Sequence, residues 1–200
     1  MYPHKSNILN QFTAHSIMKV LLFNGSMDRN QHATSYKLIE YFKNSLESEG
    51  VEVITFNLGE AAIPLFDPAI TPHPASVLEM NKFFLEADAH IWFTPLYHGS
   101  MTGVMKNCLD WLELSAKAPI PYLTNKVIGM VCWAYGEQAM QGINAMDAVA
   151  KALRAWPLPF SVPITRKDLF DNTSGEITEF YKTKFKLLKE LLISHKVTFI

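Results

Sequence analysis

The sequence predicts an α/β fold in which a doubly wound, five-stranded parallel sheet carries helices on both faces. Two patterns predict it: short apolar runs alternate with amphipathic segments of helical period, and the connections between them are short. A right-handed crossover helix is the usual way to return a chain to the next parallel strand. The size fits one domain, because the chain has 200 residues, of which 48% are hydrophobic and 18% are charged.

The predicted strands are short runs rich in branched and aromatic residues. They cover residues 19–24, 51–56, 90–94, 126–133 and 160–164. The first run remains apolar until Gly25 and Ser26, where a turn begins, so we interpret it as a buried strand. The third run stops at Pro95, which starts an irregular loop.

The predicted helices each carry one apolar face that repeats every three to four residues. They cover residues 34–49, 76–85, 102–114, 143–156 and 177–195. Gly50 follows the first helix, as a C-terminal glycine commonly does. Between the second strand and the second helix, four prolines exclude a continuous helix and predict a shaped surface loop: Pro64, Pro68, Pro72 and Pro74.

Charge and cysteine content exclude several classes of protein. Lysine and arginine total 18 against 19 acidic residues, and a formal charge of −1 gives no overall field that would attract nucleic acid. Cys108 and Cys132 stand apart without a histidine cluster, so neither a disulfide framework nor a metal site is supported, and a cytoplasmic location is expected. The longest apolar stretch, residues 127–134, is far shorter than the roughly 20 residues of a membrane span.

The first sixteen residues differ from the rest of the chain. Pro, His, Asn and Ser interrupt them without periodicity, and they lack the apolar core of a signal peptide. We therefore expect an N-terminal extension over residues 1–17 and a single domain over residues 18–200.

The loop after the first strand, residues 25–34, ends where a helix begins. In doubly wound sheets ligands bind beyond the carboxyl ends of the strands, and the unpaired amides at a helix N-terminus attract anions. The loop also supplies side-chain donors and one fixed positive charge: Ser26, Arg29, His32 and Thr34. Neither dinucleotide nor triphosphate loop motifs occur, so a monophosphate is the simpler ligand. A plain polar turn with helix caps explains the same residues equally well, and Asp28 opposes an anion.

The loop after the third strand, residues 94–103, combines glycines with aromatic side chains. Its irregular backbone leaves amides and carbonyls free to meet the polar edge of a flat heterocycle, and Tyr97 and His98 provide planar surfaces. In the alternative interpretation, Tyr97 and Trp111 only pack under the loop.

Three segments together carry a family resemblance: GSMDRNQHAT after the first strand, IPLFDP after the second, and ADAHIWFTPLYHGSMTGVMKNCLDWL around the third. The chain resembles the NADPH-dependent FMN reductase family of flavodoxin-like proteins from about residue 19 to residue 164. Its most specific part is the turn with Pro95, Tyr97, His98 and Ser100. Compared with the usual loop of that family, the first loop here has one extra residue. Arg29 therefore lies one position later than the family's arginine, and His32 occupies the position of a serine.

The resemblance implies a flavodoxin-like domain that binds FMN non-covalently and uses NADPH or NADH as co-substrate. It places the FMN phosphate on the first loop, the ring against the turn after the third strand, and the far ring edge near the end of the fourth strand. The residues it implies are Gly25, Ser26, Arg29, His32 and Thr34 for the phosphate, Pro95, Leu96, Tyr97, His98, Gly99 and Ser100 for the ring, and Ala134, Tyr135 and Gly136 for the far edge.

The implied activity is transfer of hydride from nicotinamide to flavin N5, and then of electrons to a small acceptor such as a quinone, an azo compound, a metal ion or free flavin. No catalytic acid or base is assigned. Family members commonly pair, so we expect a homodimer or homotetramer with the helix over residues 102–114 at its interface. Two alternatives stay open: a flavodoxin-like electron carrier, which such a balanced charge makes less favourable, and a binding or regulatory protein without turnover.

Overall fold

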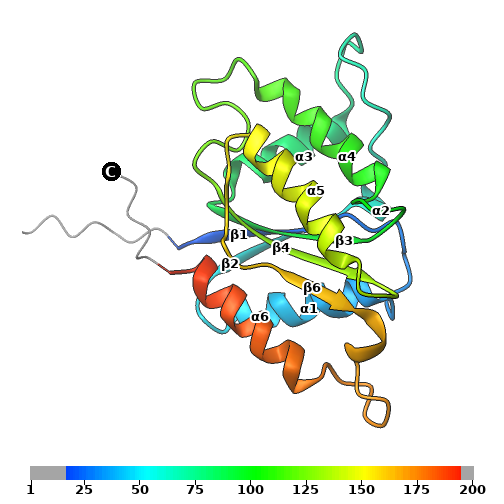
Figure 1. Ribbon diagram of the computed structural model, residues 1–200. Coiled ribbons are helices and arrows are strands. Elements are labelled where there is room, and N and C mark those ends of the chain that lie inside the picture. The colour runs from blue at the N-terminus through cyan, green and yellow to red at the C-terminus, as the bar shows by residue number, and fades with distance from the viewer. Residues whose placement is uncertain (1–16, 195–200) are drawn as a thin grey trace, which may run out of the picture.

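The computed structural model describes residues 17–194 and confirms the α/β fold class (Figure 1). One parallel sheet contains strands β1 (Lys19–Asn24), β2 (Glu52–Asn57), β3 (Ala89–Pro95), β4 (Val127–Ala134), β5 (Trp156–Pro157) and β6 (Val162–Thr165). Their order is β2-β1-β3-β4, and both β5 and β6 pair with the outer edge of β4. The direction of winding therefore switches between β1 and β3, which is where such sheets place a ligand.

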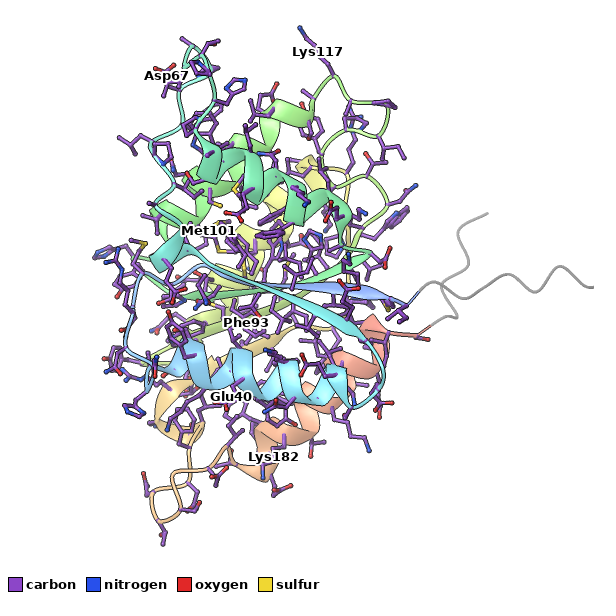
Figure 2. All side chains as sticks on the ribbon, turned by 180° about the vertical axis from the view of Figure 1, so that it is seen from behind. Glu40, Asp67, Phe93, Met101, Lys117 and Lys182 are labelled. Carbon is purple, nitrogen blue, oxygen red and sulfur yellow. The ribbon has the colours of Figure 1, made fainter. Side chains whose placement is uncertain are left out.

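Helices cover both faces of the sheet. They are α1 (Thr34–Glu47), α2 (Leu58–Ala61), α3 (Ala75–Glu86), α4 (Gly103–Asp110), α5 (Ala139–Ala152) and α6 (Glu179–Leu192), with short 3-10 helices η1 (Trp111–Ser115) and η2 (Arg166–Asp168). Figure 1 shows α3, α4 and α5 on one face and α1 and α6 on the other. Each face has its own buried apolar core, and Figure 2 shows side chains filling both layers, with Phe93 between the sheet and α1.

The five predicted strands are present, but the expected count of five was one too low. Trp156 and Pro157 pair with Val127 and Ile128, and the chain then leaves the edge of β4 before it returns as β6. Two residues carry too little apolar periodicity to be recognised from sequence.

The helix predicted over residues 143–156 was placed four residues too late. Gly142 lies inside α5, where a β-carbon would collide with Cys132 Sγ, so the glycine lets the helix pack closely on β4. The helix ends before Arg154, whose φ of 66° is left-handed, and Trp156 already belongs to the sheet.

Three smaller differences concern the helices. The short helix α2 precedes the proline-rich loop and was not predicted. The helix predicted over residues 102–114 divides into α4 and η1. The last helix ends at Leu192, and its predicted end at residue 195 lies outside the described residues, as do residues 1–16 of the predicted extension. Within residues 17–194, none of the helices has the length and apolar character needed to cross a membrane.

His90 lies on β3 with no exposed surface, between the sheet and α3. Its ring meets the edge of Phe84 at a centroid distance of 5.4 Å, and Trp92 Nε1 approaches its Nδ1 at 3.5 Å. The other ring nitrogen, Nε2, is buried without a hydrogen-bond partner. Burial, and secondarily the charge of Lys126, lowers the pKa of His90 from 6.5 to about 3. The core therefore requires a neutral imidazole.

This requirement predicts a pH dependence of stability. Between the unfolded pKa of 6.5 and the folded pKa of about 3, only the unfolded chain binds a proton at His90, so the unfolding free energy should fall as pH decreases through that window. The contribution is up to about 1.4 kcal/mol per pH unit. Urea unfolding of the wild type and of His90→Leu at a series of pH values measures it: the stability difference between the two should shift in favour of the variant below pH 6.5. Parallel stability curves would contradict a buried neutral imidazole.

Candidate functional site

The carboxyl ends of the central strands enclose a cleft of about 360 Å³, called the main cleft below. Its walls come from the segments that follow β1, β3, β4 and β6. The lining residues are Ser26, Asp28, Ala33, Thr34, Ser35, Pro95, Leu96, Tyr97, His98, Trp133, Ala134, Tyr135 and Arg166. A cleft of this size, at the point where the winding switches, is a typical small-molecule site.

Gly25 joins the first wall to the second. Its amide donates to the Phe93 carbonyl at 2.8 Å, and its own carbonyl accepts from Thr102 Oγ1 at 2.8 Å. Thr102 Oγ1 also accepts from the Met105 amide and thereby caps α4. A β-carbon at Gly25 would lie 2.6 Å from Met105 Sδ and 3.0 Å from the Phe93 carbonyl oxygen, so a larger residue would have to displace one of these neighbours. The loops after β1 and β3 are therefore fixed relative to one another.

A series of side-chain turns shapes the loop after β1. At every second position from Asn24 to Asn30, a side-chain oxygen accepts from the amide two residues ahead, at distances from 2.9 to 3.1 Å. These four bonds occupy the amides of Ser26, Asp28, Asn30 and His32, which are consequently not free for a ligand. Asp28 uses one carboxylate oxygen in the same series.

The first turn of α1 presents the donors that remain. Its N-cap is Ala33, which has no side chain able to cap the helix, and its first turn contains no acidic residue. Thr34 and Ser35 are 7% and 1% exposed and line the main cleft. Ser35 Oγ is buried without a hydrogen-bond partner. A buried hydroxyl without a partner costs free energy, unless a ligand supplies the partner.

The segment after β3 forms a tight turn. The amide and carbonyl of Tyr97 pair with the carbonyl and amide of Ser100, both at 3.1 Å. The two residues between them, His98 and Gly99, have φ values of 49° and 80°. Two successive positive φ angles are those of a type I′ turn, in which histidine is tolerated better than a β-branched residue. The turn presents Pro95 to His98 to the main cleft.

The end of β4 forms the opposite side of the cleft. The Leu96 amide donates to the Trp133 carbonyl at 2.8 Å, so the segment after β3 is held against β4. Trp133 is buried and lines the cleft, whereas Tyr135 extends outward with 82% of its surface exposed. Arg166 Nη1 donates to Tyr135 Oη at 2.6 Å, and the guanidinium carbon lies 5.0 Å from the ring centre.

The main cleft brings together eight of the site residues predicted from the sequence: Ser26, Thr34, Pro95, Leu96, Tyr97, His98, Ala134 and Tyr135. Six others adjoin these segments without lining the cleft: Gly25, Arg29, His32, Gly99, Ser100 and Gly136. Five residues that line the cleft were not among the predicted site residues: Asp28, Ala33, Ser35, Trp133 and Arg166. A small hydroxyl residue in the first turn of α1 could have indicated Ser35, but nothing local in the sequence indicated Arg166.

Arg29 turns away from the main cleft. Its Nε donates to the Gly59 carbonyl at 2.6 Å. It lines a second hollow of about 210 Å³, called the side cleft, together with Met27, Leu58, Gly59, Ala62, Ile63, Leu65, Gly103, Val104 and Asn107. The positively charged side chain of the first loop is therefore bonded to the backbone of α2.

Residues 17–194 were examined for metal ligands and for reactive thiols. Within residues 17–194 there is no group of three or more His, Cys, Asp or Glu side chains that could hold a metal ion. Both cysteines are free and buried, and burial raises the pKa of the Cys132 thiol to about 12. A thiolate nucleophile is therefore not available there near neutral pH.

Comparison with known proteins identifies a family. The family model for NADPH-dependent FMN reductase matches residues 18–167. The chain belongs to the NADPH-dependent FMN reductase family. It is accordingly an oxidoreductase that uses FMN and a nicotinamide dinucleotide. The uncapped backbone amides at the start of α1 and the hydroxyl of Ser35, which has no partner, fit a group that carries a phosphate. The residues present therefore agree with this assignment.

Two relatives illustrate the range of this reductase family. The chain is 25% identical over 194 residues to the NADPH-dependent FMN reductase ArsH of Rhizobium meliloti, covering 95% of this chain and 77% of the relative. It is 24% identical over 190 residues to the FMN-dependent NADPH-azoreductase of Staphylococcus aureus, covering 92% and 95%.

Solved structures of flavin oxidoreductases share the fold of this reductase. The flavoenzyme FerB, an NAD(P)H:(acceptor) oxidoreductase from Paracoccus denitrificans, superposes with a TM-score of 0.70 at 18% identity, covering 88% of this chain and 96% of that chain. The apo form of the NADH:FMN oxidoreductase EMOB gives a TM-score of 0.68 at 17% identity, covering 90% and 91%.

Proposed function

We propose that the main cleft holds FMN, with its phosphate at the first turn of α1 and its ring between the turn after β3 and the end of β4. The observation that carries this proposal is Ser35, a residue that lines the cleft beside the uncapped amides of α1 and whose buried Oγ has no hydrogen-bond partner. Neutral donors at a helix N-terminus bind a phosphate without a neighbouring cation. Ser26 and Thr34 complete that end of the site.

The protein residues bind and orient, and we assign none of them a proton-transfer role. FMN, when bound, would supply the redox chemistry: acceptance of hydride from NAD(P)H and transfer of electrons to an acceptor. Trp133 and Ala134 form a buried floor that excludes water. The hydrogen bond from the Leu96 amide to the Trp133 carbonyl fixes the distance between the segment after β3 and the end of β4, between which the flavin ring would lie.

We propose a small planar conjugated acceptor, such as an azo compound, a quinone or a flavin. Tyr97 and Tyr135 are 61% and 82% exposed and line the cleft from two different loops, so each offers a ring face to a flat molecule. The name of the staphylococcal relative, an azoreductase, agrees with this class of acceptor.

We also propose that the protein acts in the cytoplasm. Its two cysteines are free and buried, which suits a reducing compartment, and nicotinamide dinucleotides are the electron source that its family uses.

An anaerobic absorbance experiment tests the proposed function. Purified protein mixed with FMN and then desalted should retain the visible flavin band, lose it within seconds of NADPH or NADH addition, and regain it when an azo compound or a quinone is added. Loss of all flavin on desalting would favour a binding protein without cofactor. A retained band that neither dinucleotide bleaches would favour an electron carrier.

Substitution of Ser35 tests the phosphate position. Ser35→Ala should weaken FMN binding by about tenfold, because a hydrogen bond to a charged phosphate is lost. The FMN-free variant should unfold at the same temperature as the wild type or a higher one, since its hydroxyl has no partner in the protein. Ser45→Ala, the same change farther along α1, is the matched control and should leave FMN binding unchanged. Unaltered FMN binding in Ser35→Ala would remove the phosphate from this position.

We further propose that two copies of the chain associate through the side cleft. Leu65, Met27 and Val104 line it and are 83%, 49% and 38% exposed, so an apolar surface gathers beside α4, the helix expected at the interface.

Light scattering with gel filtration tests this association. Leu65→Asp should convert a dimer to a monomer, because a carboxylate would be buried at the interface. Leu78→Asp, at an exposed leucine of α3 outside the side cleft, is the control and should leave the dimer intact. A wild-type protein that stays monomeric over a hundredfold range of concentration would contradict the proposal.

A further inference from the structure

Arg166 brings a positive charge to the main cleft from a segment that the cofactor site does not use. It is one of three arginines in the chain. Among the described residues that line the cleft, it is the one cation. It follows β6 directly, at the start of η2, and its exposed guanidinium lies against Tyr135.

The position of β6 separates Arg166 from the start of α1. Helix α1 packs over β2, β1 and β3, whereas β6 is the neighbour of β4 on the far edge. Three strand spacings lie between β1 and β6, which corresponds to about 14 Å between their backbones. A phosphate held by Ser26, Thr34 and Ser35 is therefore at the opposite side of the cleft from Arg166.

The guanidinium of Arg166 is held in place without being neutralised. Tyr135 Oη accepts from its Nη1 at 2.6 Å, and the two side chains also make a cation–π contact. Within the described part of the chain, no Asp or Glu oxygen comes within 4.0 Å of it to form an ion pair. An arginine has five N–H donors in a planar fork, so several remain for an anion.

The backbone that carries Arg166 is anchored on both sides. Before it, the Thr165 amide donates to Tyr181 Oη of α6 at 2.9 Å. After it, Leu169 is fully buried, and Thr178 bonds to the carbonyl of Asp168 and, through its amide, to that of Leu169. The side chain is therefore presented from a fixed support, which lowers the entropic cost of binding.

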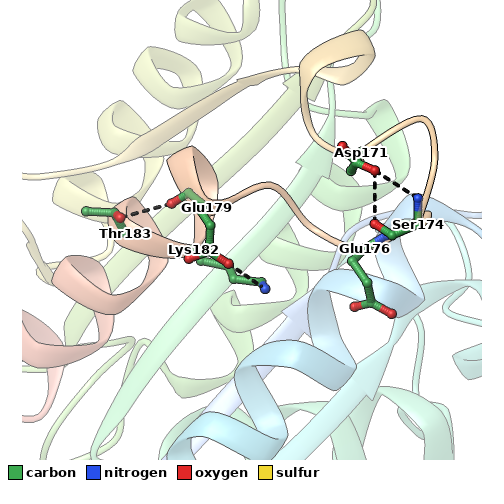
Figure 3. Close-up of polar contacts among 6 residues, drawn as sticks. All are labelled: Asp171, Ser174, Glu176, Glu179, Lys182 and Thr183. Atoms are coloured by element: carbon green, nitrogen blue, oxygen red, sulfur yellow. Dashed lines mark hydrogen bonds and ion pairs between the residues drawn. The ribbon is translucent and has the colours of Figure 1, made fainter.

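The loop between η2 and α6 reinforces this support. Figure 3 shows Asp171 bonded to Ser174, whose amide and hydroxyl donate to its carboxylate at 2.8 and 3.1 Å. These bonds and that from the Thr173 amide hold the pKa of Asp171 below its usual value. At the start of α6, the figure shows Lys182 paired with Glu179 at 2.8 Å. The carboxylates of Asp171 and Glu179 are thus engaged locally.

We propose that Arg166, positioned by Tyr135, recognises an anionic group on the substrate that docks onto the FMN-loaded cleft. This inference rests on the proposed function, because it assumes that FMN occupies the cleft with its phosphate at α1. The anionic group is either a phosphate of the nicotinamide dinucleotide or a sulfonate or carboxylate of the electron acceptor. Arg166 is thus a specificity-determining residue, and Tyr135 is a positioning residue.

Stopped-flow kinetics of the FMN-loaded protein separate the two sources. The reductive half-reaction is measured with NADPH, with NADH, and with a small neutral dihydronicotinamide that has no phosphate. The oxidative half-reaction is measured with a neutral azo compound and with its sulfonated analogue. The variants are Arg166→Gln and Tyr135→Phe. The control is Lys167→Gln, at an exposed neighbour that does not line the cleft.

In Arg166→Gln, the concentration of the anionic substrate that gives half-maximal rate should rise about tenfold, with the limiting rate unchanged, while the matched neutral substrate is unaffected. Tyr135→Phe should shift the same substrate in the same direction by less, and Lys167→Gln should shift none. An effect confined to NADPH identifies its additional phosphate, an effect on both dinucleotides identifies the diphosphate, and an effect on the sulfonated compound identifies the acceptor. Calorimetric dissociation constants of NADP⁺ and NAD⁺ provide a readout independent of turnover.

Two results would overturn the inference. One is an Arg166→Gln variant that treats charged and neutral substrates alike in both half-reactions. The other is weaker FMN binding in that variant, measured from the quenching of FMN fluorescence, since Arg166 would then be a ligand of the cofactor. A failure of the proposed function is distinguishable from both, because the wild-type protein itself would then retain no FMN or would fail to reduce it.

Discussion

The close contact of Gly25 with β3 and α4 is the constraint on which the main cleft depends. A β-carbon at this position would crowd Met105 and the Phe93 carbonyl, the same carbonyl that accepts from the Gly25 amide. The Gly25 backbone makes a second hydrogen bond, with Thr102 Oγ1. With both bonds in place, the end of β1, the end of β3 and the start of α4 form one unit. The first wall of the cleft is thus positioned by contacts outside it, and a ligand meets loops that are already oriented.

The loop after β1 then determines which groups are available to an anion. Its alternating side-chain turns consume their own amides, and Arg29 is tied to the Gly59 carbonyl. What remains is the first turn of α1 with the hydroxyl of Ser35. An anion at that end is attracted by backbone amides and the helix dipole, whereas the positive charge of Arg166 lies at the opposite side of the cleft, beside β4. The cleft therefore has two chemically different ends, which suits two ligands more than one.

The sequence was sufficient to predict the central strands and the loops that follow them, because both depend on local patterns. An apolar run defines each central strand, and the rule that ligands lie beyond parallel strand ends identifies the loops at Ser26, Tyr97 and Tyr135. Arg166 depends instead on the pairing of β6 with β4, a contact between distant segments. Arg29 illustrates the converse: its sequence position suggests a ligand, but its guanidinium meets a backbone carbonyl of the segment after β2.

Buried polar atoms without partners and residues in unusual conformations indicate a functional site only when several of them lie together. His90 Nε2 and Asn81 Oδ1 are buried without partners, yet they lie apart from the main cleft among apolar side chains, so they are costs of core packing. By contrast, three unusual residues from three separate segments all line one cleft: Ser35, whose Oγ has no partner, His98, in the left-handed region, and Tyr135, whose ring is exposed. With a net charge of −1, the protein has no overall field to draw an anionic substrate. Recognition of charge must then be local, and Arg166 is where the cleft provides it.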